Sequence, residues 1–263
     1  MCTVTFIARP SGYCLGMNRD EKLTRPSGLP PKLTTVNGRA VVCPSEPGGG
    51  TWIALNDGGA CLALINWYSV DRRIGHNPMS RGEVVKAVCA TDSYEMVQTI
   101  LNGLPLQRIN PFRLIGIFPR ARQIFEWRWN LKSLIRKKCR WKSQQWISSG
   151  FDEPTAQHVR GRTFLGALQG HSVRRLNWLR RLHGSHSPER GPFSNCMHRM
   201  DAATVSYTEV AVSRRRAGMR YHPGPPCCLL SRLKHPGKES PPTFKRSTYA
   251  LNPADLHNHL STE

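Results

Sequence analysis

The second residue of the chain carries two groups that could do chemistry together. Met1 precedes Cys2, and a residue as small as cysteine allows the initiator methionine to be removed, so that Cys2 becomes the new N-terminus. The thiol of an N-terminal cysteine attacks carbonyl groups, and its α-amine, with an ordinary pKa of about 8, serves as general base without another side chain. The alternative is that Cys2 is simply the first residue of a buried strand.

A polar quartet at residues 18–21, Asn-Arg-Asp-Glu, follows the first predicted hairpin. Two strand-like runs, Thr3–Ala8 and Tyr13–Met17, flank a Pro-Ser-Gly turn, which predicts the hairpin. A hairpin returns the end of its second strand to the start of its first, so we expect Arg19 and Asp20 to lie beside the N-terminal cysteine. A guanidinium there lowers a thiol pKa, and a carboxylate holds and orients an amine. The alternative for the quartet is a solvated polar turn.

Further strands and helices are expected along residues 1–222, which we interpret as one α/β domain of sheets packed with helices. The remaining strand predictions, each supported by turn residues or alternation, are Leu33–Val36, Ala40–Cys43, Thr51–Leu55, Ala60–Trp67, Phe112–Phe118, Ile124–Trp129, Gln145–Ser149, Thr204–Val212 and Met219–Tyr221. The helix predictions are a segment capped by Ser80 and running to Cys89, one capped by Asp92 or Ser93 and running to Leu101, Val159–Gln169 and Val173–His183.

The C-terminal segment differs in composition from the rest of the chain. Residues 225–263 are rich in Pro, Gly, Ser, Lys and His with little apolar patterning, which predicts a disordered basic tail after a domain at 1–224. The longest apolar stretches, such as Ala60–Trp67, are far shorter than the roughly 20 residues that a membrane-spanning helix needs. The sequence therefore predicts no membrane span.

The nine cysteines are odd in number and scattered, and the N-terminus shows no secretory signal pattern. These features predict reduced thiols in the cytoplasm and not a disulfide framework. No CxxC motif and no Cys/His set at zinc-finger spacing occurs, so we expect no metal site. We interpret His183, His186 and the 257–259 segment as solvated, and the pair Cys227-Cys228 as unpaired tail.

The charge balance is strongly basic, with 38 Lys and Arg against 17 Asp and Glu. Such a field attracts nucleic acid, anionic lipid headgroups and acidic small molecules without choosing among them. The stretch Arg120–Lys142 interleaves cations with Trp127, Trp129 and Trp141, a pattern that suits phosphates and stacked bases. The alternation of Glu126 to Trp129, however, is typical of a half-buried strand with core tryptophans. We therefore expect a solvated basic face, with nucleic-acid binding or a phosphorylated or CoA-like ligand as alternatives.

Several segments together resemble a known family. The opening MCTVTF, the NRDE quartet and GGGTWIALNDGG resemble the NRDE, or TANGO2-like (transport and Golgi organisation 2), family, which is similar in turn to N-terminal nucleophile hydrolases of the choloylglycine hydrolase and penicillin V acylase type. Four later segments extend the resemblance to about residue 224: FRLIGIFPR, EWRWNLK, QWISSGFDEPTAQ and CMHRMDAATVSYTEV. The resemblance implies a four-layer αββα sandwich with mainly antiparallel sheets and Cys2 at a strand end between them.

The resemblance also implies roles for individual residues. Cys2 matches the nucleophile, Arg19 and Asp20 match the charged pair beside it, and Asn56 in WIALNDGG matches part of an oxyanion hole. Such donors stabilise a tetrahedral intermediate. At the second donor the hydrolases carry an asparagine, whereas this chain offers Ser148-Ser149. Asn18 and Arg199 complete the expected substrate site, the latter as a match for a late active-site arginine.

Three function classes follow from these residues. The first is a cysteine hydrolase that cleaves the C–N bond of a small amide and needs no cofactor, and it requires the free Cys2 amine. The second is a carrier that holds haem or an acyl-CoA-like ligand in the same cleft; Cys43-Pro44 could supply a thiolate to haem iron, although a strand end at a proline-led loop is the simpler interpretation. The third is a nucleic-acid binder that uses the basic face. We favour the hydrolase.

Overall fold

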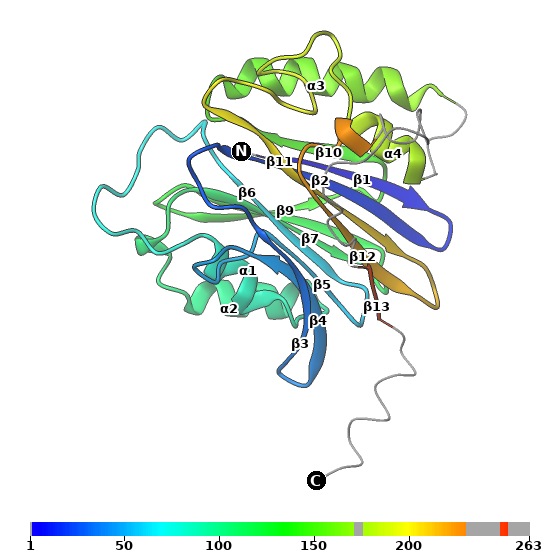
Figure 1. The fold of residues 1–263 in the computed structure, drawn as a ribbon. Helices are drawn as coiled ribbons and strands as arrows, with labels where there is room; N and C mark the ends of the chain where they lie inside the picture. The colour runs from blue at the N-terminus through cyan, green and yellow to red at the C-terminus, as the bar shows by residue number, and fades with distance from the viewer. Residues whose placement is uncertain (1, 171–175, 230–247, 252–263) are drawn as a thin grey trace.

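The computed structural model describes residues 2–170, 176–229 and 248–251, the last of these for the backbone alone. Two antiparallel sheets are stacked face to face, and a pair of helices covers the outer face of each sheet, which gives four layers in the order αββα (Figure 1). The fold class expected from the sequence is therefore confirmed. No helix among the described residues is both long and apolar enough to cross a membrane.

The first sheet has six strands in the spatial order β10-β1-β2-β11-β12-β13. Their bounds are Cys2–Arg9 (β1), Gly12–Lys22 (β2), Gln144–Ser148 (β10), Ala202–Val212 (β11), Ala217–Pro223 (β12) and Thr248–Leu251 (β13). The β1–β2 hairpin forms the centre of this sheet, and β11 returns from far along the chain to pair with β2 over its whole length. Its outer face is covered by α3 (Glu153–Leu168) and α4 (Leu176–His183).

The second sheet has seven strands that follow the chain order from β3 to β9. Their bounds are Leu29–Val36 (β3), Arg39–Ser45 (β4), Ile53–Asn56 (β5), Cys61–Asn66 (β6), Phe112–Phe118 (β7), Gln123–Trp129 (β8) and Leu134–Cys139 (β9). Between β6 and β7 the chain forms α1 (Gly82–Val88), α2 (Tyr94–Gly103) and a short 3-10 turn, Leu106–Arg108. The two α-helices cover the outer face of this sheet.

Three apolar clusters fill the spaces between the four layers. The cluster between the sheets combines Phe6 and Leu15 from one sheet with Leu55 and Ile117 from the other. A second cluster lies between the seven-stranded sheet and α1–α2, and a third lies under α3 and α4. Trp127 and Trp129 belong to the second cluster, which confirms that they are core residues. Each large apolar side chain that is fully buried in these clusters stabilises the fold by about 1.5–3 kcal/mol.

Turn and capping residues in the sequence predicted most strands and helices correctly, and the observed bounds differ from the predicted ones for local reasons. The Asn37-Gly38 turn adopts positive φ at both residues, as a tight two-residue hairpin requires. Ser93, not Asp92, caps α2, because its side chain accepts the Met96 backbone N–H. The helix expected from Val159 begins six residues earlier, at Glu153, where Asp152 caps the Thr155 N–H. Strands β9 and β13 were not predicted from the sequence.

The structure describes two short pieces of the predicted tail. Residues 227–229 form a helical turn after β12, and Thr248–Leu251 forms β13, which pairs with β12. Both pieces therefore have regular backbone structure. Residues 230–247 and 252–263 lie outside the described residues, so disorder of the tail stays a prediction there.

The hairpin turn at Gly12 gives a direct test of the packing between β1–β2 and β11. Gly12 has φ near +130°, and a Cβ there would lie 2.0 Å from the Val212 carbonyl oxygen. We expect Gly12→Ala to lower the free energy of unfolding by about 3 kcal/mol or more, because it combines overpacking with backbone strain. Gly38→Ala is the matched control, since Gly38 also has positive φ but open space around its Cβ. Urea unfolding that shows equal losses for both variants would contradict this account.

Candidate functional site

Cys2 lies at the start of β1, where two neighbouring strands flank it. In the antiparallel register Cys2 is directly opposite Arg19 of β2 on one side and Ser148 of β10 on the other. Directly opposite residues share a face, with Cβ atoms about 4.5–5.5 Å apart. The hairpin therefore brings Arg19 beside the thiol, as the sequence argument expects. Cys2 is only 7% exposed and packs at the edge of the cluster between the sheets.

Arg19 is surrounded by acidic groups. Its Nη2 lies 2.6 Å from a Glu46 carboxylate oxygen and 3.4 Å from Glu21, and the guanidinium stacks over the Trp52 ring at 4.5 Å. Arg25 contacts the same two carboxylates at 2.9 Å. The charge of Arg19 is therefore shared with two nearby anions and is not directed at the thiol alone.

The environment of Cys2 keeps its thiol protonated. Burial raises the pKa of the Cys2 thiol, and the carboxylates of Asp20 and Glu21 add to that effect, whereas Arg19 opposes it. Arg19 favours the thiolate, as expected, but burial outweighs it, so the net shift of the thiol pKa is upward. The physical reason is that a buried anion loses hydration, and the compensating cation is already paired. A nucleophilic Cys2 therefore needs a base to take its proton.

Asp20 is fully buried and held by groups from two other elements. Its carboxylate accepts a hydrogen bond from Thr204 Oγ1 of β11 at 2.7 Å and forms an ion pair with Arg160 of α3 at 3.2 Å. Arg160 also donates to Thr3 Oγ1 at 2.7 Å and to the Pro192 carbonyl at 3.2 Å. Both partners of this pair are at most 1% exposed. The charge on Asp20 is thus fixed in place by a buried cation that the sequence analysis did not identify.

A polar cavity of about 300 Å³ opens over this end of β1 and β2. Its lining comes from the strand end and from the segments that precede α1. It includes Cys2, Arg19, Asp20, Glu21, Glu46, Trp52, Asn66, Ser80, Arg81 and Asn110. This volume is at the lower end of the range for sites of drug-sized ligands. The cavity therefore suits a small polar molecule.

Two lining residues that the sequence analysis missed add binding chemistry. Asn66, at the end of β6, donates one amide hydrogen to the Tyr68 hydroxyl at 2.9 Å and has a second one to offer. Arg81, just before α1, donates to the Pro111 carbonyl at 3.3 Å, and burial lowers the pKa of its guanidinium. Within the described residues Arg81 forms no ion pair at 4 Å or less. Arg81 is therefore a partly buried cation available to an anion.

Asn56 does not lie where the resemblance implied. Its amide donates to the carbonyls of Cys89 and Thr91 at 3.2 and 2.7 Å, and its Oδ1 accepts the Ala60 N–H. These partners lie on the side of the second sheet that faces α1 and α2, and Asn56 is absent from the cavity lining. Both amide hydrogens are used there. The assignment of Asn56 as an oxyanion donor is therefore corrected: this residue ties β5 to the helices.

The other expected substrate residues divide into near and remote ones. Ser148 is opposite Cys2, fully buried, and its hydroxyl has no hydrogen-bond partner within the described part of the chain. Ser149 is also buried and accepts the Phe151 N–H at 3.4 Å. Asn18 donates to the carbonyls of His183 and Asn195, on the helix side of its sheet. Only Ser148 has both the position and the unused hydroxyl that chemistry at Cys2 requires.

Arg199, Cys43 and His183 do not join the site. Arg199 pairs with Asp201 at 2.9 Å and stacks on Phe151, outside the cavity lining. Cys43 packs against the cluster under α1, and burial raises its thiol pKa, which disfavours a thiolate ligand for haem iron. His183 is not solvated as expected: it is fully buried on α4, and burial lowers its pKa to about 3.

Comparison with known proteins identifies the family of the chain. The family model described as TANGO2, Transport and Golgi organisation 2, matches residues 1–172, well over half of the chain. The chain belongs to the TANGO2 family. No curated protein matches it. The sequence resemblance to this family is therefore confirmed.

Solved structures similar to this TANGO2-family chain share its fold. The penicillin V acylase from Agrobacterium tumefaciens has a TM-score of 0.53 and 11% identity, over 98% of this chain and 89% of the acylase. The C2A mutant of the conjugated bile acid hydrolase from Clostridium perfringens has a TM-score of 0.53 and 9% identity, over 97% and 93% of the two chains. A further variant of that hydrolase has a TM-score of 0.52 and 10% identity, over 85% and 89%. These likenesses place the TANGO2-family chain in the N-terminal nucleophile hydrolase fold.

The buried pair Asp20–Arg160 gives a stability prediction for this TANGO2-family fold. We expect Arg160→Leu to lower the free energy of unfolding by about 3–5 kcal/mol, because it leaves a buried carboxylate without its cation. Arg162→Leu is the matched control on the same helix, since Arg162 is exposed, and we expect a change within about 0.5 kcal/mol. Urea unfolding of both variants at neutral pH measures the difference, and an Arg160→Leu loss no larger than that of the control would refute the role of the pair.

Proposed function

We propose that this protein is a cysteine amidohydrolase of the N-terminal nucleophile type that cleaves the C–N bond of a small amide. The observation that carries the proposal is the position of Cys2, at a strand end between Arg19 and Ser148 and on the wall of a small polar cavity. The raised pKa of the Cys2 thiol supports a mechanism with its own base. The shared fold with penicillin V acylase and bile acid hydrolase is consistent with amide chemistry.

The α-amine of Cys2 supplies that base once Met1 has been removed. The neutral amine takes the thiol proton as Sγ attacks the amide carbonyl, and the resulting ammonium returns the proton to the leaving amine. The acyl group then remains on Sγ as a thioester, which water hydrolyses with the amine acting again as base. Asp20, held by Arg160 and Thr204, orients the amine. While Met1 remains, the α-amine belongs to Met1 and is one residue away from this position.

The oxyanion of the tetrahedral intermediate needs donors near Cys2. Asn66 lines the cavity, and Ser148 lies opposite Cys2 in the sheet. Ser148 has an unused hydroxyl directly across the strand pair, and Asn66 has an amide hydrogen beyond the one given to Tyr68. We assign these two residues to the oxyanion hole in place of Asn56. Removal of one such donor costs about 10²–10³ in kcat in enzymes where this has been measured.

Arg81 indicates the kind of amide that fits the cavity. Arg19 is already paired with Glu21 and Glu46, so Arg81 is the cavity cation best able to bind an anionic group. A guanidinium binds carboxylate or phosphate with two parallel hydrogen bonds. The proposed substrate is therefore a small amide that carries an acidic group at a distance from the scissile bond.

The carrier hypothesis for the same cavity remains the alternative, with haem or an acyl-CoA-like ligand. The cavity volume of about 300 Å³ favours a small ligand over either of these. We propose the cytoplasm as the compartment, because all nine cysteines lie in the described residues and none forms a disulfide. Specific nucleic-acid binding is the least favoured alternative.

The state of the N-terminus decides between hydrolase and carrier. We expect intact-mass measurement of the purified protein to show loss of Met1 and, after incubation with an activated ester, one acyl group on Cys2. A variant with an extra residue before Cys2 should fold normally and lose at least about 10³-fold in kcat, as should Cys2→Ala, because thiol and amine act as one unit. Full amide turnover by either variant would end the hydrolase proposal, whereas ligand binding without turnover in all forms supports the carrier.

The role of Arg81 separates acidic from neutral substrates. We expect Arg81→Leu to raise KM for an anionic amide by about tenfold or more, since a charged hydrogen bond is worth about 1.5–3 kcal/mol. The KM for a neutral amide of similar size should change little, because the scissile bond is attacked by Cys2 and not by Arg81. Steady-state kinetics on the two substrates test this assignment. An equal rise in both KM values would show that Arg81 only shapes the cavity.

A further inference from the structure

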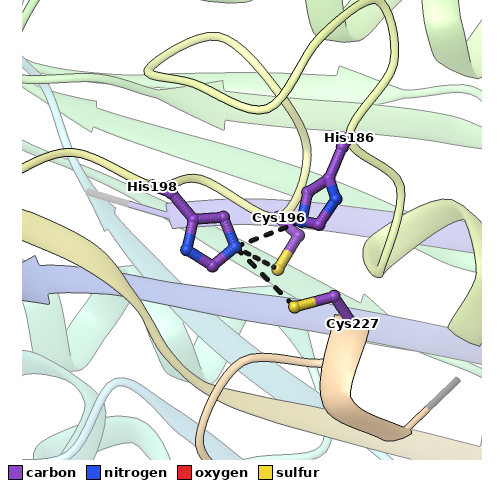
Figure 2. Close-up of side chains that lie close together, drawn as sticks. All are labelled: His186, Cys196, His198 and Cys227. Atoms are coloured by element: carbon purple, nitrogen blue, oxygen red, sulfur yellow. Dashed lines mark hydrogen bonds between the residues drawn. The ribbon is translucent and has the colours of Figure 1, made fainter. Parts of the chain in front are cut away.

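Four side chains outside the cavity converge at one point in the molecule. His186 and His198 come from the segment between α4 and β11, Cys196 lies between them, and Cys227 comes from the helical turn after β12 (Figure 2). One ligand atom from each lies within 4.8 Å of the others. From the sequence we expected His186 in a solvated loop and Cys227 in an unpaired tail, and the structure corrects both expectations.

Hydrogen bonding alone does not explain this arrangement. His198 Nε2 lies 3.1 Å from His186 Nε2, 3.5 Å from Cys196 Sγ and 3.7 Å from Cys227 Sγ, so three partners surround one ring nitrogen (Figure 2). An imidazole nitrogen has either one hydrogen or one lone pair to offer in the ring plane. It can satisfy one of these partners but not three. A shared atom at the centre of the four would satisfy all of them.

The spacing of the ligand atoms fits a tetrahedral metal ion. Bonds of about 2.3 Å to sulfur and about 2.05 Å to nitrogen imply edges of about 3.3 Å between two nitrogens and about 3.6 Å between nitrogen and sulfur. The observed separations are 3.1 Å between the histidine nitrogens and 3.5 and 3.7 Å from nitrogen to the two sulfurs. Two thiolates and two imidazoles are a common donor set for structural zinc.

We propose that His186, Cys196, His198 and Cys227 bind one structural zinc ion. Two thiols lose their protons on binding, so the centre formed by Zn²⁺, two thiolates and two neutral imidazoles has no net charge. One neighbouring contact must change. Arg190 donates to His198 Nδ1 at 3.3 Å, but a histidine bound to metal through Nε2 carries its hydrogen on Nδ1. Arg190 is exposed, so its side chain can turn away into solvent.

The proposed zinc ion would hold the segment on which the cavity residues rest. The same segment supplies the Asn195 carbonyl to Asn18 at 2.7 Å and the Pro192 carbonyl to Arg160 at 3.2 Å. It also positions Thr204, which accepts the Met197 N–H and donates to Asp20. Zinc binding would thus join the turn after β12 to the groups that fix Asp20. This proposal does not depend on the amidohydrolase function.

The test is the metal content of the untagged full chain and of two matched cysteine variants. We expect elemental analysis to find about one zinc per wild-type chain and at least tenfold less in Cys227→Ser. Cys228→Ser is the control, because Cys228 is the adjacent residue, is exposed and is outside the cluster, and it should keep its zinc. His198→Gln should lose zinc as Cys227→Ser does.

A second measurement on the wild-type protein covers the case in which a variant fails to fold. Chelation should remove the zinc and lower the Tm, and cobalt(II) added to the metal-free protein should give the visible absorption of a tetrahedral thiolate site. Zinc content and uptake below about a tenth of an equivalent in wild type would overturn the proposal. Equal zinc in Cys227→Ser and Cys228→Ser would also overturn it, as would a disulfide between Cys196 and Cys227.

Discussion

The buried ion pair between Asp20 and Arg160 is the interaction on which this end of the molecule depends. It joins the β1–β2 hairpin to α3, while Thr204 adds β11 through its hydrogen bond to the carboxylate. A buried charge without a partner is costly, so each of these elements must be in place before the carboxylate is stable in the core. Asp20 and Arg19 are adjacent in the sequence and were expected to act as one charged pair beside Cys2, but they have different partners. Asp20 forms its ion pair with Arg160 of α3, whereas Arg19 pairs with the carboxylates of Glu21 and Glu46 at the cavity.

Several hairpins of both sheets, and part of the Cys2 environment, could be predicted from local sequence signals. Hairpin turns such as Asn37-Gly38 fix the register of both strands within a few residues, and the first hairpin fixes the position of Arg19 opposite Cys2 by the same logic. The position of Asn56 could not be predicted in this way, because β5 is buried on both faces. All four of its residues, Ile53–Asn56, are buried, so no polar alternation shows which face the asparagine takes. Successive residues of a strand face opposite sides of the sheet, so an error of one residue assigns Asn56 to the space between the sheets and not to the helix side.

Residues brought together over long distances gave no usable sequence signal. Nothing in the sequence distinguishes Arg160 from the other Lys and Arg residues of the chain. Only the packing of α3 on the first sheet shows that Arg160 is buried. His186, Cys196, His198 and Cys227 have irregular spacing, because two different connections supply them. The pair Cys196 and His198, two residues apart, was the one local hint, since alternate residues of an extended chain share a side. Arg81 and Asn66 lie on segments that reach the cavity only when the second sheet forms.

The strong positive charge of the chain is a property of its surface and not of its site. Glu126 and Glu209 are nearly fully buried, and each is bound by two arginines, so acidic groups neutralise cations inside the protein. The excess of Lys and Arg over Asp and Glu lies on exposed strands such as β9, whose residues 135–138 are exposed at the edge of the seven-stranded sheet. Cations on an edge strand repel a second copy of the same edge and so oppose sheet-to-sheet aggregation. The net charge therefore reflects the surface here. At the cavity, Arg19 and Arg25 are paired with carboxylates, whereas Arg81 forms no ion pair within the described residues.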